Sequence, residues 1–500
     1  MKHFVFLFVF VVHVYSSTLH LAISSNPARL NPLLATDSAS GEITTFLFNG
    51  LVKYDKEQKN IICDLAKKYY FQNSTTLIFE LKRGVLWHDG VEFSSEDVLF
   101  TYKTLISPRI SSPYSSGFRF VKNVEKLGRY KIKVTYKQPY FKAVEIWMMG
   151  LLPKHILKDE TNLMSSKFNT HPVGTGPYML QKLEFSKDII LKANPHYFEH
   201  KPNIEYISFH VISDSMTRFL MLQSKQLDIG TLSAMEYEKK LPKNFKKDFN
   251  IYENISLSYT YLGFNMRKKK FQNPLVRKAL ALAIDKEEII QLMFFNHAKI
   301  CNGPFLPTSS AFNPDVTSPK QNIQKAKELL AQAGYTKKHP LEFEITTSNS
   351  NPTRPYVAQI IQQQLQKAGV KVHLRIMEWQ AFLNMVVFPH KFETVLLGWG
   401  LSPTPDPRPI WHSSSDTKGG FNFIGYHNKE LDRLIEKSEL ITQREVLAKI
   451  WQRMFAIIAH DNPYIFLYIP TAISAVNKNI QNIQPLPNGF WYNYIDWIKK

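Results

Sequence analysis

Two adjacent histidine–aspartate pairs, His88-Asp89 and His460-Asp461, carry the residue types that acid–base and nucleophilic catalysis use. A histidine acts as a general base only when a carboxylate orients its ring and a nucleophile lies within hydrogen-bond reach. Neighbouring residues of a helix or strand point in different directions, so neither pair forms that arrangement by itself. We interpret both pairs as turn or surface residues, while a catalytic site assembled from distant residues stays open as an alternative.

The glycine-rich segment at residues 174–177 reads Gly-Thr-Gly-Pro and does not continue as the G-x-G-x-x-G of dinucleotide-binding loops. Its proline lacks the backbone N–H that a phosphate cradle uses. The motifs G-x-x-x-x-G-K-[ST], G-x-S-x-G and H-E-x-x-H are absent from the sequence. Two cysteines, Cys63 and Cys301, are too few for a four-thiolate zinc site. The sequence therefore predicts neither a catalytic motif nor a cofactor or metal site.

Residues 1–17 have the pattern of a secretory signal peptide. Lys2 precedes an apolar run at residues 4–14, and the small residues Ser16 and Ser17 follow it. This run is too short for a membrane span, which needs ~20 residues. We expect cleavage near Ser17 and a periplasmic protein without a lipid anchor, since no cysteine follows the run; a buried N-terminal strand is the alternative.

In an oxidising compartment Cys63 and Cys301 could form a disulfide, or they could be two small buried side chains. The chain has 500 residues, enough for two or three domains with large cores. Its net charge is +20, but the lysines occur in short scattered runs rather than on one element, unlike those of nucleic-acid-binding proteins. We interpret the excess as a solvated surface and predict no nucleic-acid partner.

Helices and strands alternate along the chain. Residues 79–87 have the alternation of a strand, and Ser94 with Asp97 resembles a capping box that begins a helix. The elements expected in the second half are a strand at 341–347, a helix at 353–368, and strands at 370–376 and 394–399. A strand–helix–strand order predicts a right-handed crossover and a parallel sheet.

Several stretches, in the same order, resemble one protein family. They are residues 30–33 and 48–55, residues 79–90 (FELKRGVLWHDG) with 93–98, residues 172–178 (PVGTGPY), residues 273–279 (NPLVRKA) and residues 326–335. The family is that of the periplasmic solute-binding proteins of oligopeptide, dipeptide and nickel ABC transporters, extracellular solute-binding protein family 5. The resemblance extends over nearly the whole mature chain.

This resemblance implies an α/β, two-lobe periplasmic-binding-protein fold of the type II-like kind, with an additional inserted α/β domain and a ligand cleft between the lobes. Lobe I would comprise residues 18–50, 165–258 and 470–500, the inserted domain residues 51–164, and lobe II residues 259–469. The lobes would close around the ligand by hinge motion. The Gly-Thr-Gly-Pro turn and the Trp-His-Asp-Gly segment would then be structural.

The ligand-facing loop of the family resembles residues 398–407. In peptide-binding relatives the third residue after its tryptophan is often an aspartate that accepts the peptide amine, and here it is Ser402. In dipeptide-binding relatives an arginine in the loop after the strand binds the carboxylate of the peptide, and Ser348 stands at that position here. Arg354 follows six residues later and could replace that arginine only if this loop has a different course from that of the relatives. Asp406 is the nearest carboxylate that could bind the amine, with a turn or hinge role as the alternative.

Aromatic residues of the same half could line the cleft, because rings bury a large area at a small entropic cost. The candidates are Trp399, Trp379, Phe421 and Tyr426, each with an ordinary core position as the alternative. Asn422 follows two glycines in a loop that could bring backbone groups near a ligand. Backbone groups of these loops could bind a peptide main chain in the manner of an added strand.

Together these features predict a monomeric receptor, not an enzyme, that captures short peptides and delivers them to an inner-membrane ABC permease and its ATPase. One alternative of the same fold is a receptor for a nickel chelate or haem, with His412 or His427 as a ligand. An alternative of a different class is an exported hydrolase with dispersed catalytic residues.

Overall fold

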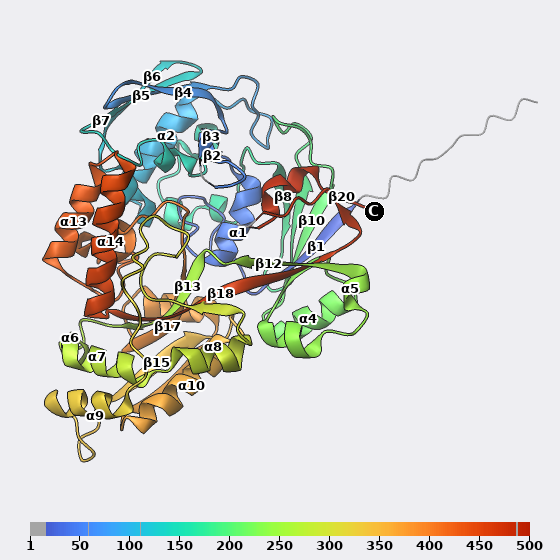
Figure 1. The fold of residues 1–500 in the computed structure, drawn as a ribbon. Helices are drawn as coiled ribbons and strands as arrows, with labels where there is room; N and C mark the ends of the chain where they lie inside the picture. Colours follow the sequence, from blue (N-terminus) through green and yellow to red (C-terminus); the bar gives the residue numbers. More distant parts are fainter. Residues whose placement is uncertain (1–16, 59, 111, 487–488) are drawn as a thin grey trace, which may run out of the picture.

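The structure is a computed structural model that describes residues 17–58, 60–110, 112–486 and 489–500 (Figure 1). Except for Ser17, the predicted signal peptide lies outside the described residues. Three β-sheets of four or more strands form the frame, and Figure 1 shows them around a common centre. Within the described part of the chain, no helix is long and apolar enough to cross a membrane.

The first sheet contains the N-terminal strand. Its strands, in spatial order, are β1 (Thr18–Ile23), β10 (Tyr206–Val211), β9 (Asp188–Ala193) and β8 (Tyr178–Leu183). Alternate residues of β1 and β9 are buried, so one face of the sheet contributes to the core. Helix α1 (Ser38–Leu47) contributes to the same core, and the carboxylate of Asp37 caps its first turn by accepting from the Ser40 N–H.

The second sheet lies at the top of Figure 1 and shares a continuous apolar core with the first. Its order is β4 (Ala66–Asn73), β5 (Thr76–Leu81), β7 (Lys131–Tyr136) and β6 (Val121–Gly128). The predicted capping box is confirmed, because Ser94 and Asp97 bond reciprocally at the start of α2 (Ser95–Leu105). The predicted strand at 79–87 is wrong at its end: β5 stops at Leu81, and Gly84 has a φ of +71° that no strand accommodates.

The third sheet has eight strands, six of them on one continuous path. That path is β11 (Ile229–Leu232), β18 (Tyr464–Asn477), β13 (Ser258–Phe264), β17 (Thr394–Gly400), β15 (Glu342–Ser348) and β16 (Lys371–Met377), while β12 (Phe249–Ile255) and β14 (Ala298–Ile300) pair with β18. Strands β15 and β16 are parallel neighbours joined by α10 (Arg354–Lys367). The predicted strand–helix–strand unit and the strand after it are therefore confirmed.

Helices contribute to separate apolar cores around the third sheet. One core contains α7 (Pro274–Ala283), α8 (Lys286–Phe294), α9 (Ile323–Gln332) and α10, a second contains α13 (Lys429–Glu439) and α14 (Arg444–Asp461), and a third contains α4 (Ser215–Gln223) and α5 (Phe245–Asp248). The shorter elements are α3 (Lys154–Leu157), α6 (Lys269–Gln272), α11 (Trp379–Phe382), α12 (Arg408–Trp411), β2 (Val52–Tyr54), β3 (Ile61–Cys63), β19 (Ile480–Gln481) and β20 (Ile498–Lys499).

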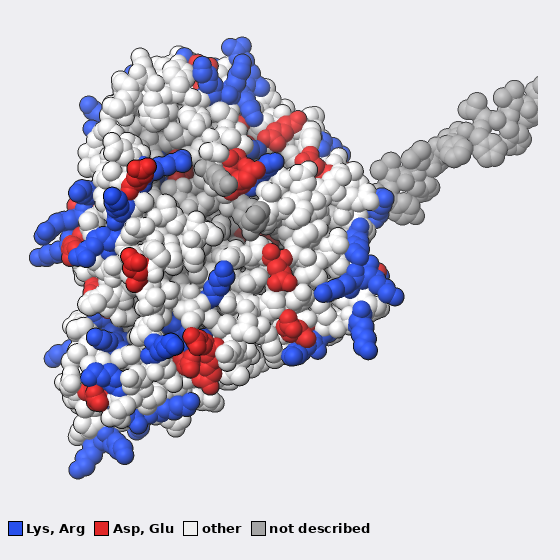
Figure 2. Space-filling model, viewed as in Figure 1, with Lys and Arg blue, Asp and Glu red and all other residues white. Residues whose placement is uncertain are grey.

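The long strand β18 passes through the predicted boundary between residues 469 and 470. It pairs with β13 through its first five residues and with β12 from Thr471 onward. The domain boundaries stay a prediction. Both described cysteines carry free thiols; Cys301 is buried and donates to the Gly303 carbonyl. On the face in Figure 2, Lys and Arg side chains are spread out, with acidic side chains between them.

Candidate ligand-binding cleft

A cavity of about 1650 Å³ lies where the three sheets approach one another. Its wall includes the end of β1 and the first turns of α1, residues 114–118 and 142–149 beside the second sheet, and several strand ends of the third sheet. Pockets for small molecules commonly have volumes of ~300–1,000 Å³. The cavity therefore has room for a ligand larger than a single amino acid or a simple metabolite.

The third sheet contributes its polar strand ends to this cavity. Strands β15, β16 and β17 are parallel to one another, so their carboxyl ends lie at the same edge of the sheet. The segments that follow those ends line the cavity: residues 350–354 after β15, Trp379 after β16 and residues 399–406 at the end of β17. Open α/β sheets commonly bind ligands outside the carboxyl ends of their strands.

The last residues of β17 have one backbone edge that β15 does not cover. Strand β15 pairs with only the first two residues of β17. On the other side, β17 pairs with β13 in an antiparallel ladder, in which every second residue directs its N–H and C=O to the partner strand. The Leu401 N–H donates to the Leu257 carbonyl at 2.7 Å, so Leu401 and the residues two and four positions before it face β13. In that register Gly398 and Gly400 direct their N–H and C=O groups away from β13. These groups form a short strand edge at the cavity, to which another extended chain could pair.

Arg354, at the start of α10, places its guanidinium over the face of β17 at Gly398, next to this strand edge. A Cβ built on Gly398 would lie 2.6 Å from Nη2 of Arg354, so the glycine leaves the space that the arginine occupies. No described carboxylate pairs with Arg354, and its Nε has no hydrogen-bond partner. Desolvation lowers the pKa of Arg354 from its ordinary value, against the opposing effect of Tyr468 and Tyr261. An anionic ligand group could satisfy this cation.

The predicted loop residues Trp399 and Ser402 both line the cavity. The half-buried indole of Trp399 donates from Nε1 to the Tyr464 hydroxyl at 3.3 Å, and its ring lies 5.2 Å from that of Phe421. Ser402 is exposed, and its hydroxyl donates to the Thr404 carbonyl. A serine hydroxyl carries no charge, so Ser402 offers a ligand only a neutral hydrogen bond.

Asp406 also lines the cavity, but a lysine from outside the third sheet already neutralises it. Its Oδ2 lies 2.9 Å from Nζ of Lys142, and Glu145 lies 3.4 Å from the same ammonium. Burial would lower the pKa of Lys142, but the two carboxylates raise it above its ordinary value. Nearby, the Tyr54 hydroxyl donates to Oγ1 of Thr404 at 3.1 Å. The loop after β17 is thus fastened to the part of the chain that carries the second sheet.

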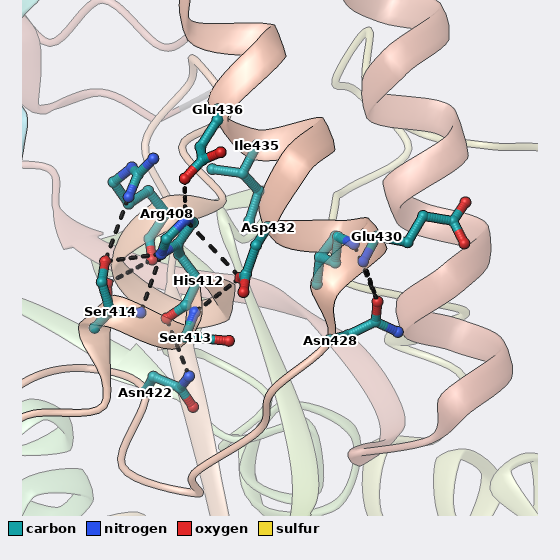
Figure 3. Close-up of polar contacts among 12 residues, drawn as sticks. Arg408, His412, Ser413, Ser414, Asn422, Asn428, Glu430, Asp432, Ile435 and Glu436 are labelled. Carbon is teal, nitrogen blue, oxygen red and sulfur yellow. Dashed lines mark hydrogen bonds and ion pairs between the residues drawn. The ribbon is translucent and has the colours of Figure 1, made fainter.

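The remaining aromatic and polar predictions separate into two groups. Trp379 and Phe421 line the cavity, whereas Asn422 and Tyr426 do not. Asn422 is fully buried and donates from Nδ2 to the carbonyl of His412 (Figure 3). The same amide group also donates to the carbonyl of Tyr426, and the two bonds hold the loop in shape. Tyr426 is buried, and its hydroxyl donates to Asp461 at 2.6 Å. Both side chains therefore support the loop behind the cavity wall.

His412 and His427, the histidines considered for a nickel chelate, are absent from the cavity wall. Figure 3 shows His412 between Ser414, which bonds to its Nδ1, and the acidic residues of α13 that face its Nε2. His427 forms an ion pair with Asp416. The wall contains neither histidine nor cysteine, and the described residues include no group of three or more metal-ligating side chains.

Sequence reasoning missed seven of the nine charged residues of the described wall, among them Glu42, Lys142 and Glu145. Glu42 lies on the accessible side of α1, and the other two lie near the second sheet. Their segments show nothing unusual in composition, and only the folded chain brings them to the ends of β15 and β17. Arg354 was one candidate for the peptide carboxylate, and the loop after β15 places it in the cavity wall.

Comparison with known proteins identifies the family. Residues 60–421 match the family described as bacterial extracellular solute-binding proteins, family 5 Middle. The oligopeptide-binding protein AppA of Bacillus subtilis (strain 168) is 31% identical over 490 residues, covering 94% of this chain and 89% of that protein.

Solved structures agree with this match. The structure of Bacillus subtilis AppA in complex with a nonapeptide has a TM-score of 0.91 and 29% identity, covering 97% of this chain and 99% of that one. NikZ from Campylobacter jejuni in complex with Ni(L-His) has a TM-score of 0.87 and 28% identity, covering 97% and 100%. The predicted two-lobe α/β fold is confirmed. The chain belongs to the bacterial extracellular solute-binding proteins of family 5.

Proposed function

We propose that this protein is an exported receptor that captures short peptides and delivers them to an ABC permease and its ATPase in the inner membrane. The observation that carries the proposal is the uncovered edge of β17, with the unpaired cation of Arg354 lying next to it. An extended peptide offers a backbone that pairs with such an edge and a terminal carboxylate that matches such a cation. The AppA relative, named for oligopeptide binding, supports the same ligand class.

In the proposed complex the peptide backbone bonds to Gly398 and Gly400, and its carboxylate bonds to Arg354. A bidentate arginine–carboxylate contact fixes the direction of the chain as well as adding binding energy. The rings of Trp379, Trp399 and Phe421 form the apolar wall for peptide side chains. Backbone contacts are independent of side chains, so this arrangement accepts peptides of varied sequence.

The residue divisions given above for lobe I, the inserted domain and lobe II are part of the proposal. Release of the ligand then requires lobe II to separate from lobe I and the inserted domain. The contacts that must break include the Lys142–Asp406 ion pair, the hydrogen bond from Tyr54 to Thr404 and the hydrogen bond from Gln380 Nε2 to the Asn26 carbonyl. The signal peptide at residues 1–17 delivers the chain to the periplasm, where it acts as a monomer and without catalysis.

The test uses the full mature protein. Mass spectrometry of ligand released from the purified protein should identify peptides, and calorimetry with defined di- to pentapeptides should give saturable binding. Mass spectrometry of the same peptides after incubation should recover them intact, whereas cleavage would point to the hydrolase alternative. A peptide panel without any binding would refute the proposal.

A nickel chelate is the second candidate, favoured by the likeness to NikZ in complex with Ni(L-His). Arg354 could bind a carboxylate of such a chelate, but the described cavity wall offers no imidazole to the metal. Calorimetry with nickel and L-histidine together, and with each alone, separates the two candidates. Binding of the mixture in the absence of any peptide binding would favour the chelate.

A further inference from the structure

The charge of the cavity wall is opposite in sign to that of the protein as a whole. The chain carries a net charge of +20, yet the wall has six acidic side chains and three basic ones. The acidic residues are Asp37, Glu42, Glu57, Glu145, Glu236 and Asp406, and the basic residues are Lys142, Arg218 and Arg354. The wall therefore favours ligands that carry positive charge.

Most of these acidic groups are already engaged within the protein. Asp37 caps α1, and Glu236 accepts from the Ser233 N–H at 2.7 Å. Glu57 lies 3.9 Å from the ammonium of Lys56. Glu145 and Asp406 share Lys142, as described above. Each of these carboxylates has a donor or a cation close to it before any ligand enters.

Glu42 differs from the other five acidic residues of the wall. Within the described parts of the chain, no hydrogen-bond donor or cation contacts its carboxylate, which lies on the accessible side of α1 beside Gly41. Desolvation by the surrounding protein raises the pKa of Glu42 to about 7, although its side chain is exposed to the water of the cavity. A ligand that fills the cavity would remove more water, and an unpaired carboxylate then becomes costly unless the ligand supplies a cation.

We infer that Glu42 is a subsite for a cationic amine of the ligand, so that the receptor prefers peptides that place an ammonium group at α1. This inference rests on the proposed function and specifies which peptides bind best. The amine is either the terminal ammonium of the peptide or a lysine side chain, since both have the same chemistry. Glu42 thus binds the amine that was predicted for Asp406, whose charge is neutralised by Lys142.

Three kinds of tetrapeptide serve as ligands in calorimetry. They are tetra-alanine with a free amine, its N-acetylated form, and an N-acetylated form with one alanine replaced by lysine, the lysine being tested at each position. We expect the wild-type protein to bind at least one cationic peptide about 10–100-fold more tightly than the acetylated, uncharged one. Loss on acetylation identifies the terminal amine, and recovery with lysine identifies a side chain.

Glu42→Gln should abolish this preference, while Glu430→Gln, a matched change at an exposed carboxylate outside the cavity wall, should keep it. A preference that survives Glu42→Gln but disappears in Asp406→Asn would overturn the inference in favour of the Lys142 cluster. Equal affinities of wild type for charged and uncharged peptides would overturn it while leaving the peptide receptor intact. Failure of every peptide to bind would instead overturn the proposed function, and this inference with it.

Discussion

Replacing Arg354 by methionine should separate the binding of ligand from the stability of the fold. Methionine keeps most of the apolar length of the side chain and removes the guanidinium over Gly398. In the ligand-free protein that guanidinium has no described carboxylate partner, and desolvation lowers its pKa. Removing this charge removes the free-energy cost of desolvating an unpaired guanidinium. The Arg354→Met protein should therefore be as stable as the wild type or more stable.

The effect on binding follows from the bond that the guanidinium is proposed to form with the peptide carboxylate. A hydrogen bond to a charged group contributes ~1.5–3 kcal/mol. Its loss should weaken the binding of a free-acid peptide by ~10–150-fold. The same peptide with a C-terminal amide lacks the carboxylate, so Arg354→Met should change its affinity by less than ~3-fold.

Calorimetry with the acid and the amide, on both proteins, measures this coupling as a double-mutant cycle. Urea unfolding monitored by circular dichroism measures stability. Arg453→Met, which removes an exposed arginine on α14, is the control for arginine loss in general. An equal loss of affinity for acid and amide, or a marked drop in unfolding free energy, would refute the assignment of Arg354.

Three further changes test other parts of the structure. Trp399→Ala should weaken peptide binding at least ~10-fold, because the cavity wall loses an aromatic anchor, and calorimetry that finds unchanged affinity would remove the loop from the site. Glu439→Gln should lower the free energy of unfolding, measured in urea, by ~3–5 kcal/mol, because it leaves the buried guanidinium of Arg408 without a charged partner. The control is Glu430→Gln in an exposed ion pair, which should lower the free energy of unfolding by less than ~1 kcal/mol. Equal effects of the two substitutions would contradict this reasoning. Lowering the pH protonates Glu42, whose pKa is about 7, so the affinity for a cationic peptide should fall by up to ~10-fold per pH unit below 7. The same fall in the Glu42→Gln protein would show that protonation of Glu42 is not its cause.

The sequence predicted the parts of the fold that local patterns determine. The capping box at Ser94 and the strand–helix–strand unit around α10 are confirmed, since hydrophobic periodicity and helix caps are local signals. The end of β5 was mispredicted, because the alternation of apolar residues continues past Leu81 while Gly84 has a positive φ. The family resemblance, not periodicity, indicated the loop after β17.

The charged groups of the cleft depend on contacts that the sequence does not contain. Asp406 was considered free to bind an amine, but its partner Lys142 lies 264 positions away. Asn422 was placed at the ligand because its loop is glycine-rich, yet its amide serves the loop itself. Only the tertiary structure decides which polar group a neighbour has already satisfied.

Among the described residues of the wall, Arg354 and Glu42 are the charges without partners; they have opposite signs and lie on α10 and α1, helices that pack into different apolar cores. While water fills the cavity, the exposed carboxylate of Glu42 is hydrated, whereas the guanidinium of Arg354 is already partly desolvated. A ligand that displaces this water must replace the hydration of both charges, so a molecule lacking either counter-charge loses affinity even where its shape fits. In the proposed complex, selection by unsatisfied charge at two points, combined with backbone pairing that is independent of side chains, would make the receptor strict about the charged groups of a peptide and tolerant of the sequence between them.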